Sequence, residues 1–263
     1  MDLELSGKHV LVTGGSRGIG LACARGFLRE GAQVSLAGRS QGHLDAALAQ
    51  LRSEGHAAVR GYAADLADAQ AALAMLDAAE AGLGPVDILV NSAGAARRTP
   101  FDELQPPAWQ SAMQAKFFTY IHVMDPAIKR MGARGAGAIV NIIGMGGKVA
   151  SPTHLAGGAA NAALMLATAG LATAYGPRGV RVNAVNPAMT LTDRMAEGLA
   201  ADARLKQRSV EEVRRDAEAR MPLGRIATPE DIADAVLFLC SPRAGYISGA
   251  IVSMDGAATP MVV

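Results

Sequence analysis

The stretch Thr13-Gly14-Gly15-Ser16-Arg17-Gly18-Ile19-Gly20 decides the fold of this chain of 263 residues. Residues 9–12, which precede it, form an apolar run typical of a buried strand, and residues 21–28, which follow it, have the composition of a helix. A strand, a glycine turn and a helix in this order form a phosphate site. Glycine lets the backbone approach a pyrophosphate, and the helix start offers N–H donors and a positive dipole end. The glycine spacing is not that of the commonest dinucleotide fingerprint, so an ordinary glycine-rich turn is the alternative.

Charge and composition narrow the classes of partner and compartment. The chain has 25 basic and 24 acidic residues, a balance that indicates neither nucleic acid nor an anionic membrane as the main partner. The two cysteines, Cys23 and Cys240, lie in apolar, helix-like stretches and are interpreted as core residues of a reducing compartment rather than a disulfide. Because residues 1–5 have no signal-peptide character, we expect a cytoplasmic protein, and we expect no metal site.

One uncharged stretch is long enough to span a bilayer. Residues 149–177 contain no Asp, Glu, Lys or Arg. The stretch is nevertheless rich in Ala, Gly and Thr, and it carries His154, Asn161 and Tyr175. We interpret it as a buried helix, with a membrane span as the less favoured alternative.

Apolar runs and helical patterns alternate along the whole chain. Strands are predicted at residues 7–13, 33–38, 57–62, 86–90, 137–143, 180–185 and 250–254. Helices are predicted at residues 18–30, 41–54, 67–81, 106–131, 153–175 and 229–240, with a helical flap at residues 190–220. The alternation predicts an α/β fold, a single doubly wound Rossmann-type domain over residues 1–263.

Five short motifs occur in a fixed order. They are the turn at residues 13–20, Asp65-Leu66, Asn91-Ser92-Ala93-Gly94, Asn183-Ala184-Val185-Asn186-Pro187, and Gly249 with Asp255-Gly256. As an ordered set they resemble the short-chain dehydrogenase/reductase family over nearly the whole chain, with one departure, Ser92, where the family usually has Asn. The resemblance implies a seven-stranded parallel sheet flanked by helices, an NAD or NADP cofactor, and hydride transfer between the nicotinamide and a carbonyl or alcohol.

The resemblance also implies which residues hold the dinucleotide. Asp65 would meet the adenine, the motif at residues 91–94 the ribose side, and residues 187–192 the nicotinamide carboxamide. The residues assigned to the cofactor are Gly14, Ser16, Arg17, Gly18, Ile19, Gly20, Arg39, Asp65, Leu66, Asn91, Ala93, Gly94, Asn161, Pro187, Thr190 and Thr192.

The end of the second predicted strand bears on the choice between NAD and NADP. Family members that use NAD usually place an Asp there, whereas this chain has Gly38 followed by Arg39, and Arg17 adds a second guanidinium in the glycine turn. A carboxylate would repel a 2′-phosphate, and guanidinium groups pair with it through charge-assisted hydrogen bonds. We therefore favour NADP over NAD. The alternative is that both arginines are solvated surface charges.

The family's usual catalytic groups are missing from the positions where the resemblance puts them. The family uses a Tyr as proton donor, a Lys four residues later on the same helical face, a Ser after the fifth strand and an Asn in the preceding helix. In this chain those positions hold Gly157, Asn161, Gly144 and Lys116. Tyr175 is the only Tyr nearby and the residue four after it is Gly179, so a shifted alignment does not restore the pair.

Two remaining groups are the candidate catalytic residues. His154 lies in the loop before position 157, and an imidazole with its ordinary pKa of about 6.5 suits proton transfer. Lys116 brings a cation where the family has an amide. The alternatives are that His154 is a plain loop residue, and that Lys116 is a snorkelling or interface side chain or replaces the lost Lys at the cofactor ribose.

Five glycines lie near the positions of the missing catalytic groups, and one long predicted helix is uncharged. Gly144, Gly146, Gly147, Gly157 and Gly158 either make room for a bulky ligand or permit tight backbone packing. The uncharged helix at residues 153–175 favours a homo-oligomer, a dimer or tetramer. The sequence of the flap at residues 190–220 does not indicate the substrate.

Three functions stay open at this point. The first is an NADP-dependent oxidoreductase with a non-standard proton path. The second is a non-redox elimination or isomerisation on the same fold. The third is an inactive homologue that serves as a nucleotide-binding or scaffold subunit, and fold alone does not choose among them.

Overall fold

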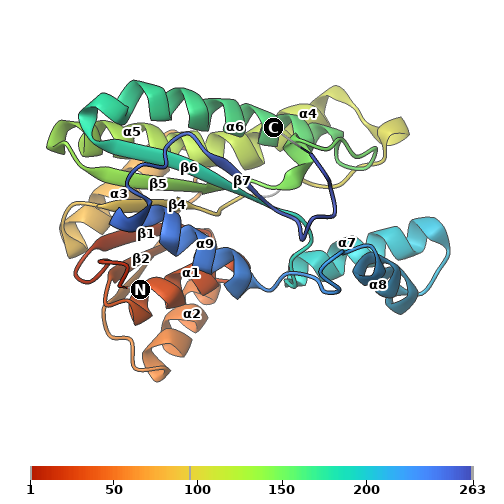
Figure 1. Ribbon diagram of the computed structural model, residues 1–263, viewed down its shortest axis with the longest axis horizontal. Coiled ribbons are helices and arrows are strands. Elements are labelled where there is room, and N and C mark those ends of the chain that lie inside the picture. Colours follow the sequence, from red (N-terminus) through yellow and green to blue (C-terminus); the bar gives the residue numbers. More distant parts are fainter. Residues whose placement is uncertain (1, 95, 262–263) are drawn as a thin grey trace.

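A parallel sheet of seven strands forms the centre of the molecule, in the order β3-β2-β1-β4-β5-β6-β7 (Figure 1). The structure, a computed structural model, describes residues 2–94 and 96–261. All neighbouring strands are parallel, so the carboxyl ends of the strands lie at one edge of the sheet. The strands are β1 (His9–Thr13), β2 (Gln33–Gly38), β3 (Val59–Ala63), β4 (Ile88–Asn91), β5 (Gly137–Ile142), β6 (Val180–Pro187) and β7 (Ile251–Met254).

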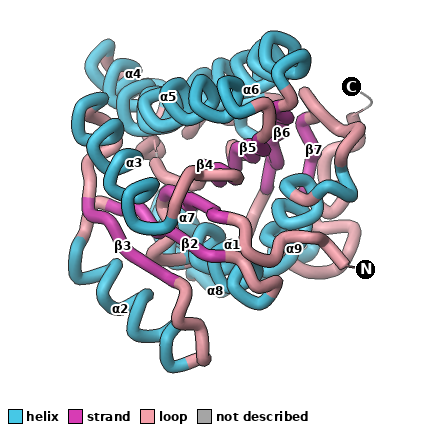
Figure 2. The backbone as a smooth tube through the Cα atoms, turned by 90° about the vertical axis from the view of Figure 1, so that its left-hand side faces the viewer, coloured by secondary structure: helices cyan, strands magenta, loops and turns pink. Residues whose placement is uncertain are grey.

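Helices cover both faces of the sheet, so the predicted doubly wound α/β fold is confirmed (Figures 1 and 2). One face carries α1, α2 and α9, and the other carries α3, α5 and α6. The main helices are α1 (Gly18–Arg29), α2 (Gln41–Ser53), α3 (Ala69–Leu83), α4 (Pro106–Ala112), α5 (Thr119–Arg134), α6 (Leu155–Tyr175), α7 (Asp193–Lys206), α8 (Val210–Ala219) and α9 (Pro229–Cys240).

Two apolar layers bury the two faces of the sheet. Successive side chains of a strand point to opposite faces, and β1 accordingly sends Val10 into one layer and Leu11 into the other. The central strands are therefore buried on both sides, which is why they read as continuous apolar runs. Cys23 and Cys240 are both buried in the layer under α1 and α9 and are not disulfide-bonded, as predicted.

A capping residue explains why α3 begins later than the sequence predicts. The helix predicted from residue 67 begins instead at Ala69. The Asp68 carboxylate accepts hydrogen bonds from the backbone N–H groups of Gln70 and Ala71, at 2.7 and 3.0 Å, which fixes Asp68 as the residue before the helix.

The long helix predicted at residues 106–131 is divided. A π-helical segment, Met113–Phe118, separates α4 from α5. The second half continues to Arg134 and ends at Gly135, whose φ of +76° suits glycine. The π-helical segment changes the register of the side chains along the helix, and it contains the buried Lys116.

The predicted flap contains α7 and α8. The two helices pack on each other through a small apolar cluster that includes Leu199, Ala203 and Val213. In Figure 1 they project from the body of the molecule on the side to which the end of β6 leads. Ser209 and Glu212 form a capping box that starts α8. The flap is thus a distinct helical pair attached to the carboxyl edge of the sheet.

By length and composition, one segment of the described residues, Leu155–Arg178, is apolar enough to cross a membrane. In the fold it is a core helix, because one side of α6 packs on the sheet with Leu164 and Thr168 completely buried. The opposite side is exposed, and Leu166 keeps 77% of its surface accessible. The predicted buried helix is therefore buried on one side only.

Candidate active site

A cavity of about 480 Å³ opens at the carboxyl edge of the sheet. Ile19 of the glycine turn, Gly94 after β4 and Gly144 after β5 form part of its wall. Pro187 at the end of β6 and Leu199 of α7 line it from the flap side. Ligands of open α/β sheets bind at this edge, and the cavity brings several predicted cofactor residues to one place.

The glycine turn and the end of β4 fit tightly together. A Cβ atom on Gly14 would lie 2.8 Å from the backbone nitrogen of Ala93, and φ of Gly14 is +65°, so no other residue fits without strain. The hydroxyl of Thr13 accepts hydrogen bonds from the N–H groups of Ser92 and Ala93, at 3.1 and 3.3 Å. Two motifs that lie far apart in the sequence are thereby held as one surface.

The start of α1 has the properties of an anion site. Its cap residue, Arg17, makes no side-chain hydrogen bond to the helix, and the first turn contains no acidic residue. The first backbone N–H groups of the helix have no helical carbonyl partner, and the dipole there is positive. The bare helix start and the glycine cradle fit a pyrophosphate group.

The adenosine end of the predicted cofactor site is basic. Arg17 and Arg39 are both exposed, and neither forms an ion pair with any residue that the structure describes. A Cβ atom on Gly38 would lie 3.6 Å from the Ser16 hydroxyl, so the end of β2 adjoins the glycine turn. Asp65 follows β3, the next strand of the sheet, and its carboxylate accepts a hydrogen bond from Ala67.

The segment after β6 offers an unsatisfied polar group. The hydroxyl of Thr190 is buried and makes no hydrogen bond within the described part of the chain, although Thr190 lines the cavity. A buried hydroxyl without a partner costs free energy, so Thr190 is a candidate contact for a ligand that binds in the cavity. Thr192 has a structural task as well, because its hydroxyl accepts from the N–H of Met195 and caps α7.

The Asn91 side chain forms its hydrogen bond within the core rather than at the cavity wall. Its amide donates to the Asn141 side-chain oxygen at 3.0 Å, and the Asn141 amide donates to the Thr168 hydroxyl at 3.0 Å. This fully buried ladder joins β4, β5 and α6. The cavity wall at this place is formed by Ser92 and Gly94 instead.

Three of the four positions aligned with the family's catalytic groups, Lys116, Gly144 and Asn161, line the cavity. Gly144 lies two residues after the end of β5 and has a φ of +128°. The amide of Asn161, from α6, lies 3.5 Å from the Gly144 carbonyl oxygen, and both residues line the cavity. His154 and Lys116 line it too, so the structure brings both candidate catalytic residues to the predicted place.

Glycines enclose the imidazole of His154. A Cβ atom on Gly157 would lie 2.2 Å from His154 Cε1, and one on Gly146 would lie 2.9 Å from His154 Cδ2. A Cβ atom on Gly158 would lie 2.6 Å from the Gly146 carbonyl oxygen. The room left at positions 146 and 157 is therefore filled by a side chain of the chain itself, and position 158 serves tight backbone packing.

Lys116 is buried and its ammonium points inward. Its Nζ donates to the hydroxyl of Tyr120 at 2.7 Å and to the carbonyl oxygen of Ile142 at 3.1 Å. The side chain is 8% exposed, so the interpretation of Lys116 as a snorkelling or interface residue is wrong. Tyr120 was not singled out from the sequence, although the Lys-x-x-x-Tyr spacing places both residues on one helical face.

Two charged residues of the cavity wall carry no signal in the sequence. Arg98 lies in the loop before α4, and Asp202 lies on α7. They approach the cavity from segments more than a hundred residues apart, so only the tertiary fold reveals them. They add one positive and one negative side chain to the wall on the flap side.

Known proteins are similar to this chain over nearly its whole length. A family profile described as Enoyl-(Acyl carrier protein) reductase matches residues 14–259. The D-threitol dehydrogenase of Mycolicibacterium smegmatis is 37% identical over 259 residues, which cover 98% of this chain and 95% of that protein.

Two solved structures with NADPH are also similar. The L-sorbose reductase of Gluconobacter frateurii, complexed with NADPH and L-sorbose, has a TM-score of 0.92 and 30% identity and covers 100% of both chains. An NADPH-bound short chain oxidoreductase of Pseudomonas aeruginosa PAO1, described as containing an atypical catalytic center, has a TM-score of 0.88 and 32% identity. That match covers 97% of this chain and 98% of the other.

Proposed function

Because the chain belongs to the short-chain dehydrogenase/reductase family, we propose that it is an NADP(H)-dependent oxidoreductase whose proton path does not use the family's tyrosine. Its reaction interconverts an alcohol and a carbonyl compound. The observation that carries the proposal is the cavity itself. Residues of the cofactor side, such as Ile19 and Thr190, share its wall with His154 and Lys116.

The cofactor is held by groups that this chain provides. The glycine turn and the start of α1 hold the pyrophosphate, and the Thr190 hydroxyl gains a partner at the nicotinamide end. Arg17 and Arg39 pair with the 2′-phosphate of NADP, where NAD would offer only hydroxyls. When bound, the reduced cofactor supplies a hydride to the carbonyl carbon of the substrate.

The proton that accompanies the hydride comes from a group other than the family's tyrosine, whose position is occupied by Gly157. Gly144 and Gly157 have no side chain to donate it, and the Asn161 amide is neither an acid nor a cation. His154 and Lys116 are titratable side chains at the wall next to those positions. General acid–base catalysis contributes about 10²–10⁴-fold, so the loss of the acting group is measurable.

The direct test is hydride transfer, followed by the absorbance of the reduced nicotinamide. The substrate panel contains polyols, ketoses and simple ketones, chosen because similar proteins act on D-threitol and L-sorbose. We expect turnover in the wild-type chain and a loss of kcat in His154→Ala or Lys116→Ala at saturating cofactor. Full kcat in both variants refutes the proton path. A tightly held cofactor that keeps its redox state during turnover indicates elimination or isomerisation instead.

Cofactor choice is tested separately by calorimetry. We expect NADPH to bind the wild-type chain more tightly than NADH, and Arg39→Asp to reverse this order. Arg29→Asp makes the same change of charge at the far end of α1 and is the control. Equal affinities in the unmutated protein contradict the preference for NADP.

A further inference from the structure

We infer that His154 is the proton donor of the site and that Gly146 and Gly157 are positioning residues. Because these two glycines have no side chains, they leave the space that the His154 imidazole occupies, and we call this space the seat of the ring. The inference rests on the proposed function and makes it specific. It assigns the role that the family gives to a tyrosine at position 157 to an imidazole that enters the same space from position 154.

The seat is closed on the side of α6 by Gly157. A Cβ atom there would lie 2.2 Å from Cε1, 2.6 Å from Nε2 and 2.8 Å from Nδ1 of His154. Real Cβ atoms do not approach other heavy atoms this closely, so a side chain at position 157 would force the His154 ring out of its present position. The imidazole stands where a side chain at position 157 would begin.

The other side of the seat is Gly146, in the loop after β5. A Cβ atom on Gly146 would lie 2.9 Å from Cδ2 and 3.5 Å from Nε2 of His154. The same point is 3.5 Å from the Asn161 amide nitrogen, which is itself 3.5 Å from the Gly144 carbonyl oxygen. The Cδ2–Nε2 edge of the ring therefore faces Gly146, in the loop that follows β5.

The backbone fixes His154 from both directions. Its N–H donates to the Ser151 carbonyl oxygen at 2.9 Å, and its own carbonyl oxygen accepts from the N–H of Gly158 at 2.7 Å. The residue is the cap of α6, so the imidazole is attached to the first turn of a core helix. A catalytic group on such a support keeps its orientation, which is what proton transfer in the transition state requires.

The proton balance of the step is simple. During reduction, the substrate carbon accepts the hydride and its oxygen gains negative charge. The protonated His154 ring gives its proton to that oxygen, the product is the alcohol, and the neutral ring takes a proton from water. In the oxidation direction the neutral ring accepts the hydroxyl proton.

The seat is tested by a double-mutant cycle on thermal stability, which needs no substrate. Gly157→Ala is expected to lower Tm because the new methyl group collides with the ring. In the His154→Ala background the same change should lower Tm by less than half as much, or raise it. Gly170→Ala is the matched control on α6, where a Cβ atom meets nothing within 4 Å, and it should raise Tm in both backgrounds. If Gly157→Ala lowers Tm equally in the wild-type and His154→Ala backgrounds, the proposed contact between position 157 and the His154 ring is wrong.

The role of the ring is tested by chemical rescue. We expect His154→Ala to lower kcat by at least about 100-fold with an unchanged affinity for NADPH, and free imidazole in the buffer to restore part of the rate. Gly157→Ala should lower kcat by at least about tenfold, because it displaces the donor without removing it. A wild-type chain that turns over while His154→Ala keeps its kcat overturns this inference and leaves the proposed function standing. A wild-type chain without turnover on the whole panel overturns both.

Discussion

Lys116 and Tyr120 lie one helical turn apart and share one acceptor, the carbonyl oxygen of Ile142. The Tyr120 hydroxyl donates to this oxygen at 2.5 Å and accepts from Lys116 Nζ at 2.7 Å. The ammonium also lies 4.4 Å from the centre of the Tyr120 ring, within range of a cation–π contact. Tyr120 is completely buried, so we expect it to act on the cavity through Lys116, which lines the cavity.

Tyr120→Phe tests this positioning role. The change removes one acceptor from a buried ammonium, and we expect the free energy of unfolding to fall by about 1–3 kcal/mol in urea titrations. If Lys116 takes part in turnover, kcat falls while KM for NADPH stays constant. Tyr246→Phe is the control, because Tyr246 is fully exposed. Unchanged stability in Tyr120→Phe would show that Lys116 finds an equivalent partner.

The family's usual catalytic groups can be restored by mutation. The triple variant Gly144→Ser, Gly157→Tyr, Asn161→Lys is expected to fail, because a tyrosine at position 157 collides with His154. Adding His154→Ala to the triple variant removes that collision. Of these two reconstructed variants, we expect only the fourfold one to reduce carbonyl compounds, and only weakly, since φ of +128° at position 144 strains a serine. Activity of the triple variant with His154 in place contradicts the seat.

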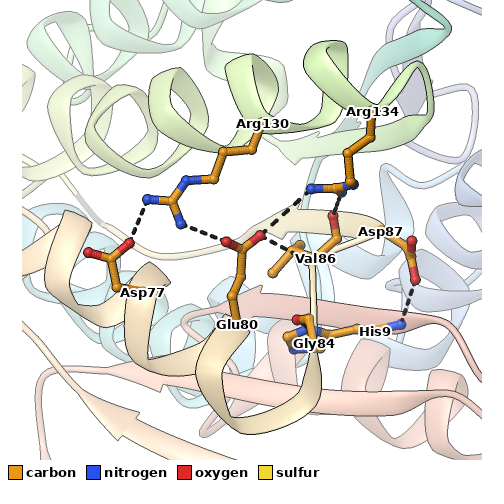
Figure 3. A network of polar contacts seen from close by, with 8 residues as sticks. All are labelled: His9, Asp77, Glu80, Gly84, Val86, Asp87, Arg130 and Arg134. Carbon is orange, nitrogen blue, oxygen red and sulfur yellow. Dashed lines mark hydrogen bonds and ion pairs between the residues drawn. The ribbon is translucent and has the colours of Figure 1, made fainter.

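Hydrogen bonds from α5 to α3, and to the turn before β4, stabilise the end of the sheet opposite its carboxyl edge. Arg130, on α5, donates to Glu80 at 2.6 Å and to Asp77 at 2.5 Å, both on α3 (Figure 3). Arg134 donates to the Val86 carbonyl oxygen at 2.5 Å. Two guanidinium groups of one helix therefore fix both the end of α3 and the turn that leads into β4.

At the same turn, His9 connects three elements through its two ring nitrogens. Nδ1 lies 2.7 Å from the Gly84 carbonyl oxygen, which can only accept, so Nε2 accepts from the Ser35 hydroxyl at 2.8 Å. The neutral ring satisfies both contacts. Burial lowers the pKa of His9, although the Gly84 carbonyl and the charges of Asp87 and Glu80 act in the opposite direction.

A lowered pKa in the folded state has a defined consequence for stability. Below about pH 6.5 the unfolded chain binds a proton at this position that the folded chain resists, so the free energy of unfolding falls as the pH falls. We expect urea titrations to show lower stability at about pH 5.5 than at about pH 7.5. His9→Asn should be less stable at both values but should show a smaller difference between them. His43→Asn, at an exposed position of α2, should keep the wild-type difference.

The elements were predictable because their local signals agree with the tertiary fold. The strand at residues 33–38 and the helix at residues 229–240 have the predicted bounds, since glycines, a proline and caps mark their ends. The π-helical segment in residues 113–118 was not predictable, because it depends on the burial of Lys116 against the end of β5. The seat of His154 was missed for a similar reason: its two glycines lie in different segments, and only the path of the loop brings them to the ring.

The cavity lies between the carboxyl edge of the sheet and the helical flap. Its floor is fixed by strand ends, and α7 contributes Met195, Leu199 and Asp202 to its wall. The sequence indicated the flap through its charge and irregularity, but not the residues that it presents. The proposed cofactor site rests on local motifs, whereas the proposed substrate side rests on contacts between distant segments.

The outer side of the molecule beyond α6 leads to the last prediction, a homo-oligomer. The whole helix carries no charged residue, and Leu166 is 77% exposed on the side that faces away from the sheet. Phe118, in the neighbouring π-helical segment, is 38% exposed. An uncharged helix face of this length is typical of a surface that is covered by a partner, and a second copy of the chain, related by a two-fold axis, offers the matching uncharged face.

Light scattering at micromolar concentration should therefore give a mass two or four times that of the 27.0 kDa chain. Leu166→Glu should lower this mass, because it places an unpaired carboxylate in the interface, where burial of a single charge is costly. Val210→Glu introduces the same group at an exposed position of α8 and should leave the mass unchanged. A wild-type protein with the mass of one chain contradicts the oligomer, and an unchanged oligomer in Leu166→Glu shows that the interface lies elsewhere.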